Sequence, residues 1–314
     1  MVKMSRILSL DTSNYTTSAC VFDTQCGIVW ENRIMLPVKE GECGVRQNDA
    51  VFLHTKNLPF LFKDIDCFDI DFVAASCCPS ERENSYMPCF TVGTSLAASL
   101  SSILKKEYYY CSHQKNHILS ALYSANKTVL LNRRFLAYHI SGGTTDICLC
   151  TPSESGVFSV KKIGGTADIS CGQLIDRTGV SLDLPFPCGK HIEKIACGNI
   201  SGKIRIKNND GFYNFSGFQN KTQQMLHNNC EKNEIASYTL DVVYSFIMDS
   251  VKYFRNKFGD LPVIMSGGVM SNKQISNSVL TNSESVYFSD PRYSVDNALG
   301  TALMCAYDKG LLNG

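Results

Sequence analysis

A strand, a turn of small polar residues and a second strand occur twice in this chain, and no other feature constrains its fold as strongly. The first copy, RILSLDTSNYTTSACVFD, lies near the N-terminus, and its first strand is predicted to end at Asp11. The second copy, RFLAYHISGGTTDICLCTP, lies near the middle of the chain. Each copy joins two β-rich runs through Ser, Thr, Gly or Asn. Two ordinary hairpins would explain either copy alone, but the pair indicates an internal duplication.

A third glycine turn follows a buried strand further along the chain. The stretch LPVIMSGGVMSNKQIS predicts an apolar strand, Leu261 to Met265, then Gly267 and Gly268, then a helix that begins near Asn272. A helix with one apolar stripe, Tyr238 to Phe258, precedes it. Helix, strand, Gly-Gly and helix in this order is typical of an α/β sheet, in which nucleotides bind at the carboxyl ends of the strands. We therefore expect a nucleotide site.

Length and composition limit the classes of protein to which the chain can belong. With 314 residues, the chain is long enough for two lobes or a pair of packed domains, and its 44% hydrophobic content supports a large core. Its apolar segments are too short to cross a bilayer and no secretory signal is recognisable, so we expect an intracellular protein without a membrane partner. The 15 cysteines are scattered and form no zinc-knuckle pattern, which favours reduced, buried thiols.

Two of the six histidines, His113 and His117, stand four residues apart in SHQKNHILSAL. On a helix these positions share one face, so both imidazoles can reach one metal ion. Polar residues at this spacing also commonly form a solvated helix face. The residues between them lack the glutamate that a zinc-protease helix places beside its first histidine, which counts against a metalloprotease.

Together these motifs resemble the TsaD/Gcp family with its Kae-type members, the tRNA threonylcarbamoyladenosine biosynthesis transferases formerly labelled O-sialoglycoprotein endopeptidases. The resemblance runs through LDTSNYTTS, HQKNH, HISGGTTD, GQLIDRTGVSLDLPFPCG, MSGGVMSN and VDNALG in family order. It implies an α/β protein of the two-lobed actin-like ATPase (ASKHA) superfold, with duplicated βββαβα-type lobes. We expect lobes at residues 1–131 and 132–293, and a C-terminal helix at about 294–314, capped by Ser294 and ended by Gly310, that packs back on the first lobe.

The resemblance gives His113, His117 and Asp296 as metal ligands. Without it, Asp296 would be interpreted as a capping residue in the first turn of the last helix. His139 is either a fourth ligand or an ordinary strand histidine. Two imidazoles and a carboxylate suit one divalent ion, iron or zinc, and leave coordination positions open for a substrate oxygen.

The same matching implies contacts to an adenine nucleotide, either threonylcarbamoyl-AMP or ATP. Backbone N–H groups of the SGGT turn would hold phosphate, and its two glycines, which lack Cβ, allow close approach. Asp176 suits a ribose because its carboxylate can accept from two neighbouring hydroxyls; alone, it would be interpreted as a surface helix residue. The full expected set is Ser141, Gly142, Gly143, Thr144, Asp176, Gly189, Glu193, Gly267, Gly268 and Asn272.

The implied reaction transfers a threonylcarbamoyl group from its adenylate to the exocyclic amine of the adenosine next to the anticodon of tRNA, with Asp11 and Ser13 as catalytic residues. The chain departs from the family at the usual acidic pair of the first turn, where it has Tyr15 and Thr16. A nucleotide- and metal-binding paralogue without activity, acting as a regulator or assembly subunit, is therefore the alternative. Further departures are Gln173, Arg177, Cys188, the GVRQNDAVFLH stretch that ends at His54, and the loop CCPSERENSYMPCF, where a Gly-Pro-Gly loop is usual.

The charge balance limits what the chain can do with tRNA alone. Its formal net charge is +1, and each neutralised phosphate requires a Lys or Arg, so we expect weak intrinsic affinity for tRNA. The family implies two cytoplasmic partners, a non-catalytic homologue of the same fold and a small ATPase. The small-residue helix predicted at Phe90 to Leu104 is our candidate partner or homodimer surface, and an ordinary core helix is the other interpretation.

Overall fold

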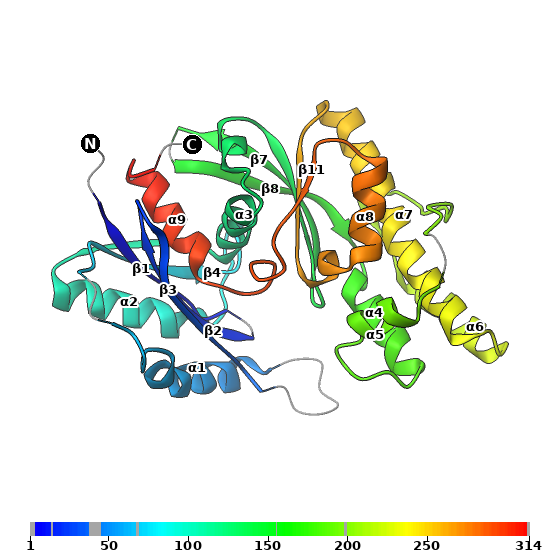
Figure 1. Cartoon of the computed structure of the whole chain (residues 1–314), viewed down its shortest axis with the longest axis horizontal. Helices are drawn as coiled ribbons and strands as arrows, with labels where there is room; N and C mark the ends of the chain where they lie inside the picture. Colours follow the sequence, from blue (N-terminus) through cyan, green and yellow to red (C-terminus); the bar gives the residue numbers. More distant parts are fainter. Residues whose placement is uncertain are drawn as a thin grey trace. The chain divides into compact units, whose positions relative to one another are not determined.

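The computed structural model of the chain describes residues 4–13, 15–37, 45–66, 69–154, 156–197 and 200–312 (Figure 1). The chain forms two compact units. The first contains the residues up to Asn132, the short segment Ser153–Phe158 and the residues from Val295 onward. The second contains Arg133–Pro152 and Ser159–Ser294. The C-terminal segment thus belongs to the same unit as the N-terminal one. No helix within the described ranges is both long and apolar enough to cross a bilayer.

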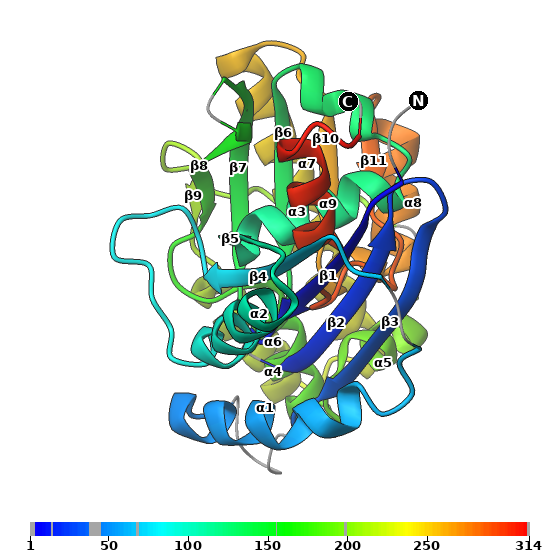
Figure 2. The same cartoon turned by 90° about the vertical axis from the view of Figure 1, so that its left-hand side faces the viewer.

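The first unit is a mixed sheet covered by helices. Its elements are β1 (Arg6–Asp11), β2 (Thr16–Asp23), β3 (Gly27–Met35), α1 (Gln47–Leu61), β4 (Phe72–Cys78), α2 (Phe90–Leu104), β5 (Glu107–Ser112), α3 (His113–Ser124), the 3₁₀ helix η1 (Thr128–Asn132) and α9 (Leu299–Asp308). The strand order is β3-β2-β1-β4-β5. β1 runs antiparallel to β2 and parallel to β4. Figure 2 shows α9, in red, beside α3 on this sheet.

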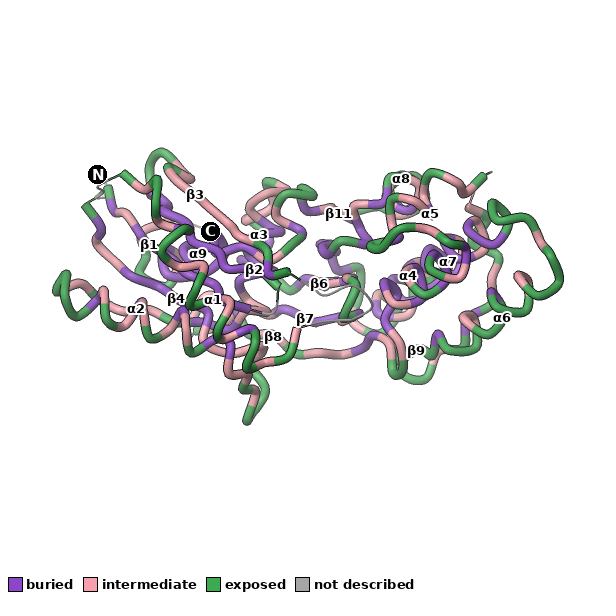
Figure 3. Tube along the Cα trace, turned by 90° about the horizontal axis from the view of Figure 1, so that it is seen from below, coloured by how far each residue is buried: buried purple, intermediate pink, exposed green. Residues whose placement is uncertain are grey.

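The sheet of the first unit is packed on both faces, by α9 and α3 on one and by α2 and α1 on the other. Every residue of β2 is buried, and so is every residue of α9 from Leu299 to Ala306, which the purple tube in Figure 3 follows. α9 packs on β1, β2, β4 and β5 as well as on α3. The sequence of a strand or helix that is buried on all sides is almost entirely apolar, as in LGTALMCA of α9. The last helix is therefore part of the core.

The second unit is built on a six-stranded sheet. Its elements are β6 (Phe135–Ile140), β7 (Thr145–Ser153), β8 (Gly156–Thr166), α4 (Cys171–Ser181), α5 (Gly189–Ile195), β9 (Phe212–Tyr213), α6 (Ser216–His227), α7 (Lys232–Phe258), β10 (Val263–Ser266), the 3₁₀ helix η2 (Gly268–Ser271), α8 (Lys273–Asn282) and β11 (Val286–Phe288). The strand order is β11-β10-β6-β7-β8-β9. The core forms between this sheet and the long helix α7, which buries Leu240, Val243 and Phe246.

The two sheets repeat one topology, which confirms the predicted duplication. In each, a hairpin of two antiparallel strands (β1 and β2, β6 and β7) is followed by a third strand on the same side. On the other side of the first strand come two parallel strands, β4 and β5 or β10 and β11. The carboxyl ends of the central parallel strands therefore carry the glycine and hydroxyl turns, as the sequence predicts.

The predicted bounds of α2 are correct, whereas the predicted start of the last helix is not. α2 begins at Phe90 and ends at Leu104 as predicted, and it buries one face towards β4. The prediction for the last helix was wrong at its start: α9 begins at Leu299, and Asp296 lies in the loop before it. The reason is that Ser294 Oγ donates to a backbone carbonyl instead of capping a helix. Gly310, with φ +65°, ends the helix as expected; residues 313 and 314 lie outside the described ranges.

Gly267 offers a test of the second sheet. Its φ is +99°, and a Cβ there would lie 2.2 Å from the carbonyl oxygen of Ile140. Gly267→Ala should therefore destabilise the protein by more than about 1 kcal/mol, because alanine resists this backbone conformation and meets a fixed backbone atom. The midpoint of urea denaturation measures the effect. Gly268→Ala is the matched control, since nothing lies within 4 Å of its Cβ position; equal midpoints for the two variants would contradict the prediction.

Candidate metal centre and nucleotide contacts

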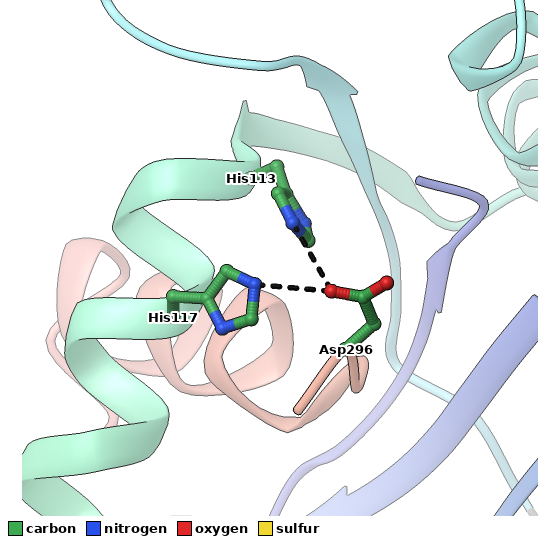
Figure 4. Close-up of side chains that lie close together, drawn as sticks. All are labelled: His113, His117 and Asp296. Carbon is green, nitrogen blue, oxygen red and sulfur yellow. Dashed lines mark ion pairs between the residues drawn. The ribbon is translucent and has the colours of Figure 1, made fainter. Parts of the chain in front are cut away.

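His113, His117 and Asp296 converge in the first unit (Figure 4). α3 begins at His113 because the Ser112 side chain caps it, and the second imidazole follows one turn later on the same face. Asp296 reaches both from the loop before α9: its Oδ1 lies 3.3 Å from His117 Nε2 and 3.6 Å from His113 Nε2. The ligand atoms of the three residues lie within 4.8 Å of one another.

This donor set fits a small divalent cation. Ligand bonds of about 2.1 Å in a tetrahedral arrangement place neighbouring donor atoms about 3.4 Å apart, which is close to both measured N–O separations. Side-chain exposure is 7% for His117 and 18% for Asp296. Two nitrogens and one oxygen leave part of the coordination sphere for another ligand, as in catalytic rather than structural sites.

Asp11 supports the first histidine. Its Oδ2 accepts from His113 Nδ1 at 2.8 Å, which leaves Nε2 of that ring directed at Asp296. The carboxylate is fully buried at the end of β1, and its Oδ1 accepts from the backbone N–H of Ser13 at 3.0 Å. A carboxylate behind a metal-binding imidazole fixes the tautomer and orientation of the ring. Asp11 thus lies where it positions a ligand.

Asn116 joins three segments of the site, and sequence reasoning missed it although it stands within HQKNH. Its Nδ2 donates to Asp11 Oδ2 at 3.0 Å and to the backbone carbonyl of Asn297 at 2.5 Å. Its Oδ1 accepts from the backbone N–H of Thr301 at 3.0 Å. The amide is fully buried. It ties the loop that carries Asp296 to the helix that carries both histidines.

The surroundings of the site shift the pKa values of His113 and His117 in opposite directions. Burial opposes the charged form of His113, but the carboxylates of Asp11 and Asp296 outweigh it and raise the pKa of His113 to about 10. Burial, and then the charge of His113, lower the pKa of His117. Burial would raise the pKa of Asp296, but its hydrogen bonds to both imidazoles hold that pKa well below its usual range. His117 therefore favours the neutral form that binds metals, and a bound cation would replace the proton of His113.

His54 is a second residue that sequence reasoning did not assign. It is fully buried on α1, and its Nδ1 lies 2.9 Å from Thr17 Oγ1. Burial lowers the pKa of His54, while the charges of Asp11 and Asp296 act in the opposite direction, which places it near both carboxylates. Ser13 Oγ is also buried and has no hydrogen-bond partner among the described residues. The only sequence signal for His54 is its position at the end of the divergent stretch GVRQNDAVFLH.

His139 belongs to the second unit, whereas the three grouped ligands belong to the first. It lies on β6, paired with Asp146 of β7, and its Nδ1 is 3.3 Å from Ser266 Oγ. These are the contacts of a strand histidine. Its role as a fourth ligand stays a prediction.

The expected phosphate turn follows β6. Ser141 N–H donates to the carbonyl of Thr144 at 2.8 Å, which closes the turn. Ser170 at the start of α4 donates from Oγ to the carbonyl of Gly142 at 2.7 Å and so fixes one side of it. At Gly143, nothing lies within 4 Å of the Cβ position, so the turn is open on that side. An open glycine turn at the end of a strand is a shape that suits an anion.

Asp176 lies on α4 beside this turn. Its Oδ2 is 3.9 Å from the Cβ position of Gly142. Its Oδ1 accepts from the backbone N–H of Cys188 at 2.8 Å, directly before Gly189 begins α5. Burial raises the pKa of Asp176, and the Cys188 N–H opposes that shift. The structure therefore brings Gly142, Asp176 and Gly189 into one region of the second unit.

The remaining expected nucleotide contacts gather at the start of α8. Gly267 ends β10 against the backbone of Ile140, next to the phosphate turn. The Asn272 side chain accepts from a backbone N–H of α8 at 3.0 Å and caps it. Glu193 Oε1 accepts from the backbone N–H of Lys273 at 2.6 Å, so this carboxylate holds the helix start. Glu193 and Asn272 thus have structural partners in addition to their expected role.

The sequence matches a known family over most of its length. A family model described as tRNA N6-adenosine threonylcarbamoyltransferase matches residues 60–303. Curated relatives with that name include one from Metamycoplasma arthritidis, 26% identical over 96% of this chain and 98% of the relative. Another, from Sulfurihydrogenibium sp., is 28% identical over 93% of this chain and 87% of the relative. A third, from Thermotoga neapolitana, is 27% identical over 97% of this chain and 94% of the relative.

Solved structures of similar fold confirm the expected fold class. Component A of the Acidaminococcus fermentans (R)-2-hydroxyglutaryl-CoA dehydratase has a TM-score of 0.57 at 13% identity, covering 98% of this chain and 99% of that one. HypF from T. kodakarensis has a TM-score of 0.61 at 12% identity, covering 99% of this chain and 49% of that one. At these identities the likeness shows the fold alone, the actin-like ATPase (ASKHA) superfold.

Asp11→Asn should weaken metal binding. An amide in place of the carboxylate removes the charge behind His113, and loss of such a supporting carboxylate typically lowers metal affinity by about 10–100-fold. Competition with a chromophoric chelator measures the affinity for Zn²⁺. Asp69→Asn, which changes an exposed carboxylate of the same unit, is the control. An unchanged affinity in Asp11→Asn would show that the hydrogen bond does not support the ligand.

Gly300→Ala should separate α9 from α3. A Cβ at this position would lie 1.9 Å from the backbone carbonyl oxygen of Asn116, so the two helices must move apart and carry Asp296 away from the histidines. We expect a loss of stability of about 1–3 kcal/mol from overpacking, together with lower affinity for Zn²⁺. Urea denaturation and the same chelator assay measure both. Gly217→Ala, at a helical position with nothing within 4 Å, should behave as the parent protein.

Proposed function

This chain belongs to the tRNA N6-adenosine threonylcarbamoyltransferase family, and on that premise we propose that it transfers a threonylcarbamoyl group from threonylcarbamoyl-AMP to the exocyclic amine of the adenosine next to the anticodon of tRNA. The observation that carries the proposal is the convergence of His113, His117 and Asp296. The two histidines share one face of α3, and Asp296 reaches them from the loop before α9, far away in the sequence.

The donor is an activated mixed anhydride, so the protein has to orient the reactants, stabilise charge and exclude water. A divalent ion, iron or zinc, would supply Lewis-acid stabilisation of a substrate oxygen when bound by the three ligands. Asp11 would hold His113 in its binding orientation, and Asn116 would hold the Asp296 loop. The residues therefore fix the site before the substrate arrives, which avoids reorganisation during the reaction.

The second unit would bind the adenylate part of the donor. Backbone N–H groups of the open SGGT turn would donate hydrogen bonds to the phosphate oxygens, and Asp176 beside it would accept from ribose hydroxyls. The phosphate is also the leaving group, so N–H groups aimed at it would favour departure of AMP. Three features support this assignment: the turn ends a parallel strand, it is open at Gly143, and Asp176 lies beside it.

One variant pair tests the reaction. His117→Ala should lose bound metal, measured by elemental analysis, and should form no threonylcarbamoyladenosine from synthetic threonylcarbamoyl-AMP and a tRNA transcript, measured by mass spectrometry of the digested nucleosides. His227→Ala, an exposed histidine of α6, is the matched control and should keep both. Full product formation by His117→Ala would contradict a metal-dependent transfer.

A non-catalytic role is the second candidate function, and the residues at positions 15 and 16 favour it. Tyr15 and Thr16 replace the acidic pair that the family usually has in this turn. The protein would then bind metal and adenine nucleotide as a regulator or assembly subunit. ATP binding by calorimetry and intact metal content, with no product even when candidate partner proteins are added, would favour this role over the transferase.

A further inference from the structure

Two cysteines lie next to each other at the end of β4, where CCPSERENSYMPCF replaces the usual loop of the family. The Sγ atoms of Cys77 and Cys78 are 3.6 Å apart. In a regular strand, neighbouring side chains point to opposite faces of the sheet. Here the pairing of β4 with β5 shifts between Ser76 and Cys78, so Cys77 is the extra residue of a β-bulge. The bulge allows two adjacent thiols to touch.

Both thiols are partly accessible to solvent, and their pKa values are shifted in opposite directions. Both side chains are half-buried, whereas most other cysteines of the described ranges are buried. The hydrogen bond from the Cys77 thiol lowers the pKa of Cys78. Burial and the Glu81 carboxylate oppose this shift, and the Lys115 ammonium, which is paired with Glu81, supports it. The same hydrogen bond raises the pKa of Cys77. The directions of the two shifts favour Cys78 as the attacking thiol and Cys77 as the thiol that keeps its proton.

The pair also lies against the first turn of α3. Cys78 is the strand partner of Ser112, whose side chain caps this helix. The next residue, Pro79, accepts from the backbone N–H of Gln114 through its carbonyl at 3.0 Å. Any rearrangement of the end of β4 therefore reaches the cap and the first N–H groups of α3.

We propose that Cys77 and Cys78 form a disulfide-exchange site, at which a small organic disulfide oxidises both thiols to a disulfide between adjacent residues and thereby loosens the first turn of α3. The Cys78 thiolate attacks one sulfur of the small disulfide, forms a mixed disulfide and releases one thiolate. The Cys77 thiol gives its proton to that thiolate and attacks the Cys78 sulfur, which releases the second thiolate. The two cysteines lose two electrons, and the small disulfide is reduced to one thiol and one thiolate; the thiolate can take from solvent the proton that Cys78 released when it ionised.

Ring closure has to change the bulge. The two sulfur atoms must move from 3.6 Å into covalent contact, and the Cα atoms of neighbouring residues are closer together than those of an ordinary disulfide. The strain favours reduction, so the modification is reversible by small thiols. It also displaces the backbone that pairs with Ser112 and accepts from Gln114.

Thiol mapping tests the chemistry on the full-length protein. The reduced protein is treated with 4,4′-dithiodipyridine under native conditions, blocked with iodoacetamide and digested for mass spectrometry. We expect the peptide with Cys77 and Cys78 to lose two hydrogens and to carry no adduct, whereas the exposed single thiols Cys26 and Cys197 each keep a pyridylthio group. In Cys77→Ser, Cys78 should keep the adduct. Separate adducts or carbamidomethyl groups on both Cys77 and Cys78 of the parent protein would overturn the exchange site.

Amide hydrogen exchange tests the effect on α3 and requires neither metal nor transfer activity, so its outcome is independent of the proposed function. Oxidised parent protein should exchange at Gln114 and Lys115 at least tenfold faster than the reduced protein, and added thiol should reverse the change. Cys77→Ser and Cys26→Ser serve as controls: the first should not respond to the disulfide, and the second should respond as the parent does. Equal exchange in both redox states of the parent protein would refute the coupling to α3.

Discussion

The site of the first unit depends on one buried amide. The side chain of Asn116 bonds to Asp11 and to the backbone of Asn297 and Thr301, which are 181 and 185 positions away along the chain. A buried amide with unsatisfied groups is costly, so each of these bonds has to form if the helix pair packs at all. The packing of α9 on α3 and the arrangement of the three candidate metal ligands therefore depend on one network. Gly300 permits the approach, because any larger residue would meet the α3 backbone.

The duplicated topology explains why binding residues collect where they do. Both sheets place a strand end next to a turn of small residues, and neighbouring parallel strands end at the same edge. In the second unit this edge carries an open glycine turn with Asp176 beside it. In the first unit the corresponding turn carries Asp11 and Ser13, whose polar groups are buried. The same architecture thus forms an open glycine turn in one copy and a buried hydrogen-bond network in the other.

Sequence patterns predicted the parts of the fold that local rules decide. The apolar run and turn residues around Asp11 and Ser141 were sufficient for both hairpins, and the small-residue helix at Phe90 to Leu104 had recognisable ends. Sequence patterns did not predict the start of α9. Serine commonly caps helices, but the Ser294 side chain donates to a backbone carbonyl instead. The metal ligands came from family resemblance, since the spacing of two histidines alone is also that of a solvated helix face. The contacts of Asn116 and His54 could not be predicted from local patterns, because their partners are distant in sequence.

The hydrogen bonds of Asp11 limit its use as a base in any transfer reaction, in which the substrate amine has to lose a proton. Its Oδ2 already accepts from His113 and Asn116, and its Oδ1 accepts from Ser13, so little of this carboxylate is available to a substrate amine. Thr16 is buried at 6% exposure, and a carboxylate there would be expensive without a partner. Tyr15 is exposed but carries a phenol in place of a carboxylate. Because Asp11 is engaged and neither Tyr15 nor Thr16 carries a carboxylate, we expect any base that takes the amine proton to come from outside this turn.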